Sequence, residues 1–565
     1  MNAGTLKSRI LCILFVTIIP VLLYLQTLNF GLTHFDDDVI ISNNITFLSN
    51  IKNADKAFTT SAFITKLSAF YSPLQTLSYM IDIQLSDAKS TWMFHLTNVL
   101  LLGLIAITLF LILQRFSIPP VPALFATIIY SVHPLFISSV AWIPARGDLF
   151  LTLFSLLSFL NYINYLQRKK VIYLLLSWME FTLALFSKET AVLLPIIISI
   201  YVFTFSDRRF DKKYILSMVL FAMSGIFWYW LRLKAIGGIS SPSDNVGFKQ
   251  FISNLQTIPE SLAKFFLPFN IAPIPGFTIF NTIIGLSIII LIVIAFIKIK
   301  HLSTQVKIFW LSWYLLLMLP PMIYKNTQIE YLDHRFFLPL IGILIFVMVS
   351  IPEKWFEKVK LKFYVVMGII CLILCLVTLI KTTSYSDHIT FYNSAVEHNA
   401  NSFFTYNSRG VIRLGRNNLV GAIDDFNHAI KIIPDKAEVY NNRGLAKVNK
   451  NDIQGAFEDY NKAIELHKNY VEAYLNRGMA YLQTTNYNKA IDDYNKVIEL
   501  CPDLSQVYNN RGSAWGSLGK YQQAIEDFNK AIKIDSNYSE AYYDRGISKY
   551  YLKDYKGDLR IVRWL

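Results

Sequence analysis

Cysteine is scarce in this chain. Three of the four cysteines, Cys12, Cys371 and Cys375, lie inside long apolar runs, and Cys501 stands alone near the C-terminus. In an apolar run a thiol usually acts as a small apolar filler. The spacing of the four matches neither a disulfide framework nor a set of metal ligands. The sequence therefore offers no disulfide-stapled fold and no metal site.

Acidic residues are outnumbered by basic ones, 39 against 53, which gives a formal net charge of +14. Most of this excess lies in short basic clusters between apolar runs. A membrane protein needs such clusters at the inner ends of its helices. The charge therefore does not call for a nucleic-acid partner.

Long hydrophobic runs are what the chain has in excess. It is 54% hydrophobic and its mean hydropathy is +0.39, which is too apolar for a soluble protein of 565 residues. About twenty apolar residues cross the hydrocarbon core of a bilayer. The first run is too long for a cleaved signal peptide, and no small-residue cleavage site follows it. We predict eleven spans, near residues 10–30, 93–113, 121–141, 147–166, 171–187, 189–205, 214–233, 276–297, 307–324, 335–351 and 363–381.

The loop cations predict that the N-terminus lies inside. With this orientation every inner segment is basic and the short outer loops are not, as the positive-inside rule requires. The inner cations are Lys7, Arg9, Arg115, Arg168, Lys169, Lys170, Arg208, Arg209, Lys212, Lys213, Lys298, Lys300, Lys354, Lys358, Lys360 and Lys362. With eleven spans, the first outer loop (31–92), a second outer loop (234–275) and everything after residue 382 lie on the outer side.

The C-terminal part repeats every 34 residues. Arg-Gly pairs recur at this period, an alanine follows each of the first four glycines by twelve residues, and an aromatic residue comes four further on. This pattern is typical of tetratricopeptide helix pairs, in which small residues allow close helix packing. The glycines are Gly410, Gly444, Gly478, Gly512 and Gly546. We predict a linker helix over 383–402 and repeats over 403–565, four full and a fifth truncated, because Asp558 replaces the expected alanine.

Three asparagines stand two residues before their glycines: Asn442, Asn476 and Asn510. A ladder of amides along a solenoid can bind the backbone of an extended peptide, whatever its sequence. The alternative is that asparagine is merely tolerated on a solvated face. We expect the neighbouring arginines to pair with acidic residues of the second helices, namely Asp425, Asp459, Asp493 and Asp527.

Charged and polar residues of the membrane part gather on the predicted outer side. They are Asp36, Asp37, Asp38, Asp82, His95, His133, Arg146, Asp148, Lys188, Glu189, Asp333, His334 and Arg335. Such groups are costly near a bilayer and are functional when they face a cavity. A cation could hold a lipid phosphate while a carboxylate accepts an acceptor's proton. Taken singly, the aspartates also fit a solvated exit from the bilayer, the histidines packing, and the arginines snorkelling anchors.

The second outer loop contains apolar residues at helical spacing. They are Phe248, Phe251, Ile252, Leu255, Leu262, Phe265 and Phe266. This pattern predicts an amphipathic helix lying in the membrane interface. It could cover a groove for a lipid chain or serve only as an anchor.

Several motifs, taken in order, resemble the transmembrane and tetratricopeptide-repeat O-mannosyltransferase family. These are DDDVIISNN after the first span, YSPLQTLSYM, FHLTN, SVHPLFISSVAWIPARGDLF, LFSKET and DHRFFLPL. The family belongs to the GT-C class of polyprenyl-phosphate-sugar glycosyltransferases. The resemblance implies an all-α fold, with a GT-C-like transmembrane domain over 1–382 followed by an α-solenoid of tetratricopeptide repeats.

The resemblance also assigns roles to residues. Its first-loop pattern, matched from Asp36 to Asn44, selects Asp36 and Asp37, with Asp36 as general base. Donor-phosphate binding is expected of Arg146, Arg335 and Lys188, with His95, His133, Asp148, Glu189 and His334 in support. The register of the repeats, not the resemblance, is the reason to expect that Asn442, Asn476 and Asn510 hold the acceptor. The chain departs from the family at Gly147, which follows rather than precedes the arginine, at His334, where glutamate is usual, and at Ser72, where arginine is usual. Lys66 or Arg146 would have to replace that last cation.

The expected function is transfer of a mannose-like sugar, with inversion, from a polyprenyl-phosphate co-substrate to a protein hydroxyl on the outer side. We expect no cofactor and no metal. The protein would be a multi-pass protein of a bacterial cytoplasmic membrane, with extracytoplasmic repeats. A membrane-anchored repeat scaffold without chemistry is the main alternative. A flippase or polymerase of lipid-linked oligosaccharides would instead carry charges along the spans themselves.

Overall fold

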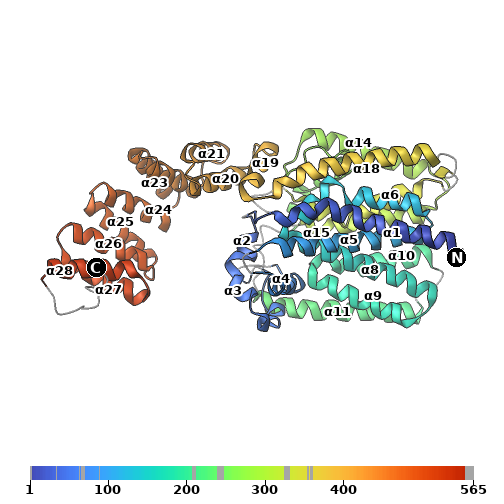
Figure 1. Cartoon of the computed structure of the whole chain (residues 1–565), viewed down its shortest axis with the longest axis horizontal. Coiled ribbons are helices and arrows are strands. Elements are labelled where there is room, and N and C mark those ends of the chain that lie inside the picture. The colour runs from blue at the N-terminus through green and yellow to red at the C-terminus, as the bar shows by residue number, and fades with distance from the viewer. Residues whose placement is uncertain are drawn as a thin grey trace. The chain divides into compact units, whose positions relative to one another are not determined.

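A computed structural model describes residues 3–33, 35–62, 64, 70–87, 90–206, 211–237, 247–323, 331–352, 355–356 and 360–553. The described residues form helices joined by turns, and none of them is in a strand. The all-α prediction is therefore confirmed. The chain divides into two compact units, Met1–Ala400 and Asn401–Leu565 (Figure 1).

Each of the eleven predicted spans coincides with helix in the first unit. An apolar segment becomes helical in a membrane because a helix satisfies its own backbone hydrogen bonds. The helices are α1 (Ala3–Tyr24), α5 (Trp92–Arg115), α6 (Pro120–Ser131), α7 (Ile137–Ala141), α8 (Arg146–Arg168), α9 (Val171–Ser187), α10 (Leu194–Phe205), α11 (Lys212–Ile236), α14 (Ile279–Lys298), α15 (Thr304–Ile323), α16 (Leu340–Ser350) and α18 (Lys360–Thr382).

Seven helices among the described residues are long and apolar enough to cross a membrane alone. An eighth crossing is possible through α6 and the segment Pro134–Ala141, which are bent by 49°. The bend falls at Pro134, where a helix would lose a backbone donor. The shorter apolar helices are α9, α16 and Glu189–Phe205. The number of spans therefore stays a prediction.

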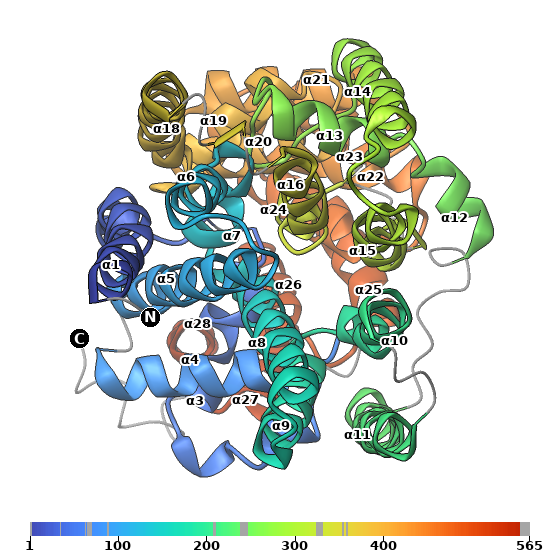
Figure 2. The ribbon, with the colours of Figure 1, turned by 90° about the vertical axis from the view of Figure 1, so that its right-hand side faces the viewer.

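The periphery of this unit is apolar. Figure 2 looks along the helices, so that α1, α11, α14 and α18 appear end-on around the rim. Ile226 on α11, Ile297 on α14 and Ile380 on α18 are each about 70% exposed, at 71%, 71% and 68%. Side chains of this kind on a helix exterior suit contact with lipid.

The segment predicted as the first outer loop folds as a small helical cap on the bundle. Its helices are α2 (Asp37–Ile40), α3 (Ile45–Leu48) and α4 (Pro73–Leu85). Ile41, Leu48, Met80 and Phe94 are among the buried residues of its own apolar core. The three helices lie at one end of the bundle, and the N-terminus lies at the other (Figure 1). This core fixes the aspartates against the ends of the long helices.

The segment predicted as the second outer loop contains two helices, α12 (Phe248–Ser253) and α13 (Thr257–Phe266), in place of one amphipathic helix. Phe248 is 78% exposed, whereas Leu262 is 2% exposed, so the segment has one apolar outer face and one buried face. The buried face packs closely on α14. A side chain at Gly285 would place its Cβ 1.9 Å from the carbonyl oxygen of Pro259. Only glycine allows the two helices to approach this closely.

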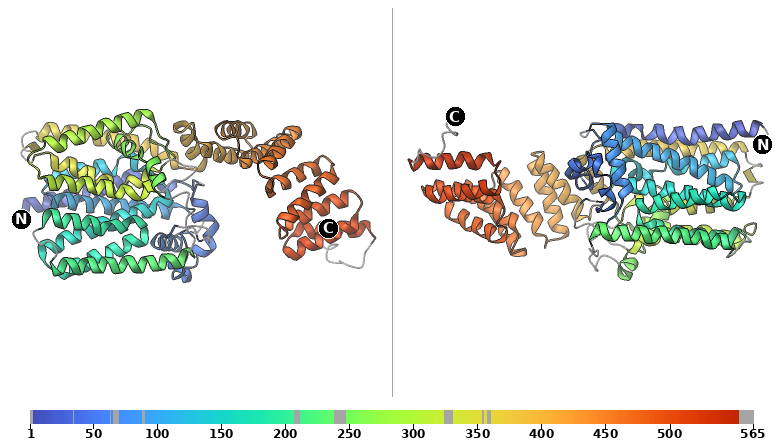
Figure 3. Two further views of the ribbon diagram at one scale, coloured as in Figure 1. Left: turned by 180° about the vertical axis from the view of Figure 1, so that it is seen from behind. Right: turned by 90° about the horizontal axis from the view of Figure 1, so that it is seen from below.

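The second unit is a stack of helix pairs (Figure 3). Its helices are α20 (Phe403–Gly415), α21 (Leu419–Ile432), α22 (Ala437–Asn449), α23 (Ile453–Leu466), α24 (Val471–Gln483), α25 (Tyr487–Leu500), α26 (Ser505–Ser517), α27 (Tyr521–Ile534) and α28 (Ser539–Tyr551). In the first four repeats the repeated glycine of the first helix faces the aromatic ring of the second. A Cβ at Gly444, for example, would lie 2.7 Å from Cε1 of Tyr460. Asp558 lies outside the described residues.

The predicted pairing of arginines with acidic residues of the second helices is confirmed. Arg443 donates from Nε and Nη2 to the two carboxylate oxygens of Asp459, at 2.9 and 2.5 Å. The same bidentate pair joins Arg409 to Asp425, Arg477 to Asp493 and Arg511 to Asp527. These aspartates are buried, so the pairs fix the helices of each repeat to one another.

Candidate active site

The aspartate triplet lies where the chain enters α2. Asp37 is 1% exposed, and its Oδ2 accepts hydrogen bonds from the backbone N–H and the hydroxyl of Thr33, at 2.6 and 2.5 Å. Asp36 is only half-buried, and Asp38 accepts a hydrogen bond from Ser42 at 3.2 Å. The three neighbours therefore differ in access, and Asp36 is more accessible than Asp37.

Burial raises the pKa of both Asp36 and Asp37 to about 6. For Asp36 the positive charge of Arg335 opposes this rise. For Asp37 the Thr33 hydrogen bonds oppose it. A carboxyl group that titrates near neutral pH can both accept and release a proton under working conditions.

A short turn, η9 (Asp333–Phe336), brings His334 and Arg335 to the same region. Arg335 is half-buried and His334 is buried. Burial, and then the charges of Lys188 and Arg335, lower the pKa of His334 well below its usual range, so this imidazole is neutral. The positive charges of Lys188 and Arg335 therefore both act on His334.

Lys188 is held by a carboxylate from α8. Its Nζ lies 2.7 and 2.8 Å from the two carboxylate oxygens of Asp148, and 23% of its side chain is exposed. Nε2 of His334 lies 3.8 Å from Oδ2 of the same aspartate. Lys188 and His334 both contact Asp148, Arg335 follows His334 directly in the chain, and the charge of Arg335 acts on Asp36. We call these five residues the outer cluster.

Arg146 points elsewhere, although it is two residues from Asp148. Residues two apart in a helix lie on nearly opposite faces. Arg146 is fully buried, and its Nη1 lies 2.6 Å from Oδ2 of Asp82 on α4. It also donates to Asn98 at 2.8 Å, to Ser78 at 2.9 Å and to the carbonyl of Phe94 at 2.6 Å.

These partners occupy most of the donors of the Arg146 guanidinium. The placement favours a structural role, in which Arg146 ties α4 and α5 to α8, over binding of a donor phosphate. Gly147 fits the same packing, because a Cβ there would lie 2.7 Å from Oε1 of Gln75 on α4. The glycine that follows the arginine therefore allows α4 to approach α8.

The remaining supporting residues lie apart from the outer cluster or at its edge. His133 is buried and joins helices, since its Nε2 lies 3.0 Å from the carbonyl of Phe265 and its Nδ1 accepts from the N–H of Leu135 at 3.2 Å. His95 is buried with its ring edge-on to Phe30. Glu189 is half-buried and follows Lys188 directly. Lys66 lies outside the described residues, and Ser72 is the residue before α4.

Sequence reasoning missed a second buried ion pair behind η9. Lys264 on α13 lies 3.1 Å from both carboxylate oxygens of Asp333, and its side chain is fully buried. Burial raises the pKa of Asp333 to about 6, and Lys264 opposes the rise. The pair fixes the turn that carries His334 and Arg335. Its only sequence signal was a lysine on the polar side of an amphipathic helix.

Among the described residues of the chain, no three His, Cys, Asp or Glu side chains are grouped as they would be around a metal ion.

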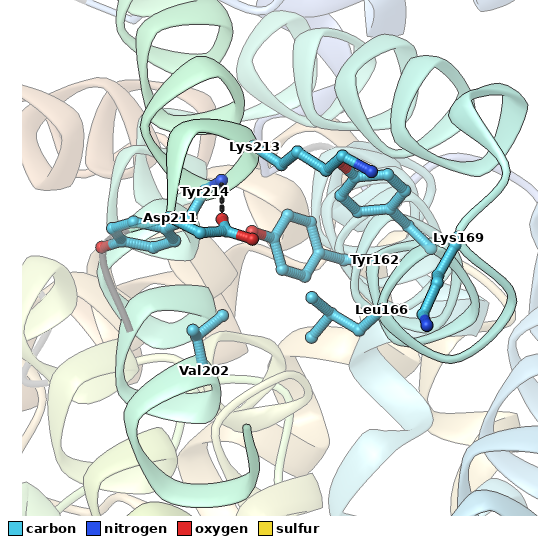
Figure 4. Close-up of a pocket in the computed structure, with 8 residues that line it drawn as sticks. Tyr162, Leu166, Lys169, Val202, Asp211, Lys213 and Tyr214 are labelled. Atoms are coloured by element: carbon cyan, nitrogen blue, oxygen red, sulfur yellow. Dashed lines mark hydrogen bonds between the residues drawn. The ribbon is translucent and has the colours of Figure 1, made fainter. Parts of the chain in front are cut away.

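A pocket lies between α8, α10 and α11. It is lined by Tyr162, Leu166, Lys169, Val202 and Lys213, and Asp211 caps α11 there by accepting from the N–H of Tyr214 at 2.7 Å (Figure 4). Its lysines belong to predicted inner loops, so it is separate from the outer cluster.

The three predicted ladder asparagines lie on the first helices of successive repeats and are half-buried. Asn442 donates from Nδ2 to Asn407 at 3.3 Å, and Asn476 donates to Asn441 at 2.9 Å. Nδ2 of Asn510 is buried and has no partner among the described residues. Two of the three amides thus link neighbouring repeats.

Comparisons with known proteins match both units. Residues 59–230 match the family described as dolichyl-phosphate-mannose-protein mannosyltransferase. Residues 446–485, 471–504 and 505–538 match tetratricopeptide repeats. Protein O-mannosyl-transferase TMTC4 of Mus musculus is 33% identical over 141 residues, which cover 22% of this chain and 19% of that protein.

Solved structures resemble only part of the chain. The crystal structure of MamA is 24% identical, with a TM-score of 0.26, and covers 27% of this chain and 90% of that one. The crystal structure of YrrB, described as a tetratricopeptide protein with an unusual peptide-binding site, is 21% identical, with a TM-score of 0.26, and covers 28% and 82%. The apolar helices and the mannosyltransferase-family segment together indicate a multi-pass membrane protein. In joining that segment to tetratricopeptide repeats, the chain resembles the transmembrane and tetratricopeptide-repeat O-mannosyltransferase family, although it spans only 19% of the length of the relative named above.

Proposed function

We propose that this chain is a membrane glycosyltransferase that moves a mannose-like sugar from a polyprenyl-phosphate donor to a protein hydroxyl on the outer side. The observation that carries the proposal is the outer cluster, in which the half-buried Asp36 lies within the field of Arg335. A base and a phosphate-binding cation are the two groups that this transfer needs near one another. The match of residues 59–230 to a mannosyltransferase family supports the same reaction class.

In the proposed reaction, Asp36 accepts the proton of the acceptor hydroxyl as its oxygen attacks the anomeric carbon. The bond from that carbon to the phosphate oxygen breaks, and polyprenyl phosphate leaves as an anion. Arg335 and Lys188 would neutralise it, since both side chains are partly exposed. A single displacement inverts the anomeric carbon. Asp37 would orient the loop through Thr33.

Arg146 has no contact with the phosphate in this scheme, because its guanidinium is fully buried against Asp82. Asp148 and His334 would hold Lys188 in place, and Glu189 would lie beside it. His95 and His133 would support the packing of the bundle. The scheme needs no cofactor beyond the lipid-linked sugar itself.

The test is transfer from a polyprenyl-phosphate sugar to a peptide in proteoliposomes. General base catalysis contributes about 10²–10⁴-fold, so Asp36→Asn should reduce transfer by that order and leave donor binding nearly unchanged. Arg335→Gln should weaken donor binding instead. Asp38→Asn removes the same charge two residues away and is the matched control. A damaging Asp38→Asn with a silent Asp36→Asn would show that the wrong aspartate is assigned.

We also propose that the repeats hold the acceptor protein through the amide ladder. Changing Asn442, Asn476 and Asn510 together to alanine should weaken capture of a long acceptor and spare transfer to a short free peptide. Some loss of stability is expected, because two of these amides link repeats. Equal loss on both substrates would argue against an acceptor role. If all the catalytic variants are silent while the repeats still bind a protein, the chain is a scaffold.

The proposal further requires the repeats and the outer cluster to share one side of the membrane. A reporter fused after Leu565 should therefore behave as extracytoplasmic, and one fused after Lys170 as cytoplasmic. If both reporters behave as cytoplasmic, the repeats lie on the opposite side of the membrane from the aspartates, and the repeats cannot hold the acceptor for this reaction.

A further inference from the structure

The amide ladder ends in a carboxylate. The position two residues before the repeated glycine is asparagine in the second, third and fourth repeats, and in the fifth repeat it is Asp544. Asp544 lies on α28, the first helix of its repeat, which contacts the first helix of the preceding repeat, α26. The ladder therefore changes from neutral to negative at this end of the stack.

An open hollow of about 440 Å³ lies at this point. It is lined by Asn509 from α26 and by Ser539, Glu540, Tyr543 and Asp544 from α28. Two of the five lining residues are acidic and none is basic. Tyr543 is 51% exposed and presents an aromatic ring beside the carboxylates.

Asn509 supplies an independent observation. Its side chain is 5% exposed, and its Oδ1 is buried without a hydrogen-bond partner among the described residues. The side chain also hydrogen-bonds Asp544, whose carboxylate accepts from the hydroxyl of Ser513 at 3.2 Å. A buried acceptor without a donor is unfavourable unless a ligand provides the donor.

The charge balance points in the same direction. Burial and the nearby charge of Glu540 raise the pKa of Asp544, against the hydrogen bonds from Ser513 and Asn509. A cation in the hollow would relieve this repulsion. Lysine and arginine side chains provide several donors and a positive charge on a long apolar stem, and they are attracted to aromatic faces.

We infer that this hollow binds the positively charged side chain, lysine or arginine, of an extended protein segment lying along the amide ladder. The ladder would hold the segment's backbone, and Asp544, Glu540 and Asn509 Oδ1 would select a basic residue where the segment passes the end of the ladder. The inference builds on the proposed capture of acceptors by the repeats. It concerns binding alone, so it can be tested without glycosyl transfer.

The experiment uses the full chain in detergent and measures binding of fluorescent peptides by polarisation. One peptide is an extended Ser/Thr/Ala sequence with a single central lysine, and its partner carries glutamine in that place. At low salt the lysine peptide should bind roughly three- to tenfold more tightly, the range expected for a partly exposed charged hydrogen bond. The preference should shrink at about 0.5 M salt, because salt screens the charges.

Asp544→Asn should abolish the preference and leave the glutamine peptide's affinity unchanged. Glu526→Gln is the matched control, since it removes one negative charge from the exposed surface of the second helix α27, outside the hollow. Equal binding of the two peptides by the unmodified chain would overturn the inference, even if Asp544→Asn failed to fold. A preference for the lysine peptide that survives in Asp544→Asn would also overturn the inference. Loss of transfer with an intact lysine preference would instead count against the proposed reaction alone.

Discussion

Replacing Arg146 with methionine should lower the stability of the membrane unit and should not weaken donor binding by the folded protein. The substitution keeps much of the side chain's length but leaves Asp82 buried, 3% exposed, without its cation. Breaking a buried ion pair by removing one partner typically costs about 3–5 kcal/mol. The lost hydrogen bonds to Ser78 and Asn98 act in the same direction.

The loss should depend on pH. Burial already raises the pKa of Asp82 with Arg146 opposite it, and removal of the guanidinium should raise that pKa further. A carboxyl group whose folded-state pKa is raised destabilises the fold above that pKa, and the penalty disappears as the pH falls through it. The difference in stability between the Arg146→Met variant and the unmodified protein should therefore narrow towards acidic pH.

Thermal unfolding in detergent is the assay, followed by donor binding on the folded fraction. At roughly 2–4 °C per kcal/mol the midpoint should fall by about 10 °C. Arg168→Gln is the control, because Arg168 is exposed and donates only to Tyr173 among the described residues. Adding Asp82→Leu to Arg146→Met should restore much of the stability, since a hydrophobic pair often replaces a buried ion pair without loss. An unchanged midpoint with lost donor binding would refute the structural role.

Four further predictions concern single residues. Transfer should decline as the pH falls below about 6, because Asp36 is then protonated, and a pH–rate profile of the unmodified chain should lack this acid limb if another group is the base. Gly285→Ala should destabilise the membrane unit in a thermal melt, because its Cβ would clash with backbone 1.9 Å away on α13, and an unchanged melt would contradict that packing. Gly444→Ala should lower the stability of the repeats by about 1–3 kcal/mol through its clash with Tyr460. A Cβ at Gly415 would meet no atom within 4 Å, so Gly415→Ala should raise the stability of the repeats by up to about 1 kcal/mol, because alanine favours a helix over glycine. The unfolding midpoints of the Gly444→Ala and Gly415→Ala variants, measured by circular dichroism, should therefore move in opposite directions.

The sequence by itself determined where the apolar helices and the repeats lie along the chain. Apolar runs marked the helices of the membrane unit because a segment in lipid must satisfy its own backbone. The 34-residue period marked the solenoid because each repeat packs on its neighbours in the same way. The same regularity made pairs such as Arg443 with Asp459 predictable, since their spacing is fixed within each repeat.

The tertiary structure alone decided which outer charges meet. Arg146 and Arg335 looked alike in sequence, each a cation beside an apolar segment. Arg146 is fully buried against Asp82, whereas Arg335 is half-buried and its charge acts on Asp36. The ion pair of Lys264 with Asp333 joins residues 69 positions apart. Such contacts depend on which face each helix turns towards its neighbours. That choice is made by the packing of the whole bundle, and no local pattern records it.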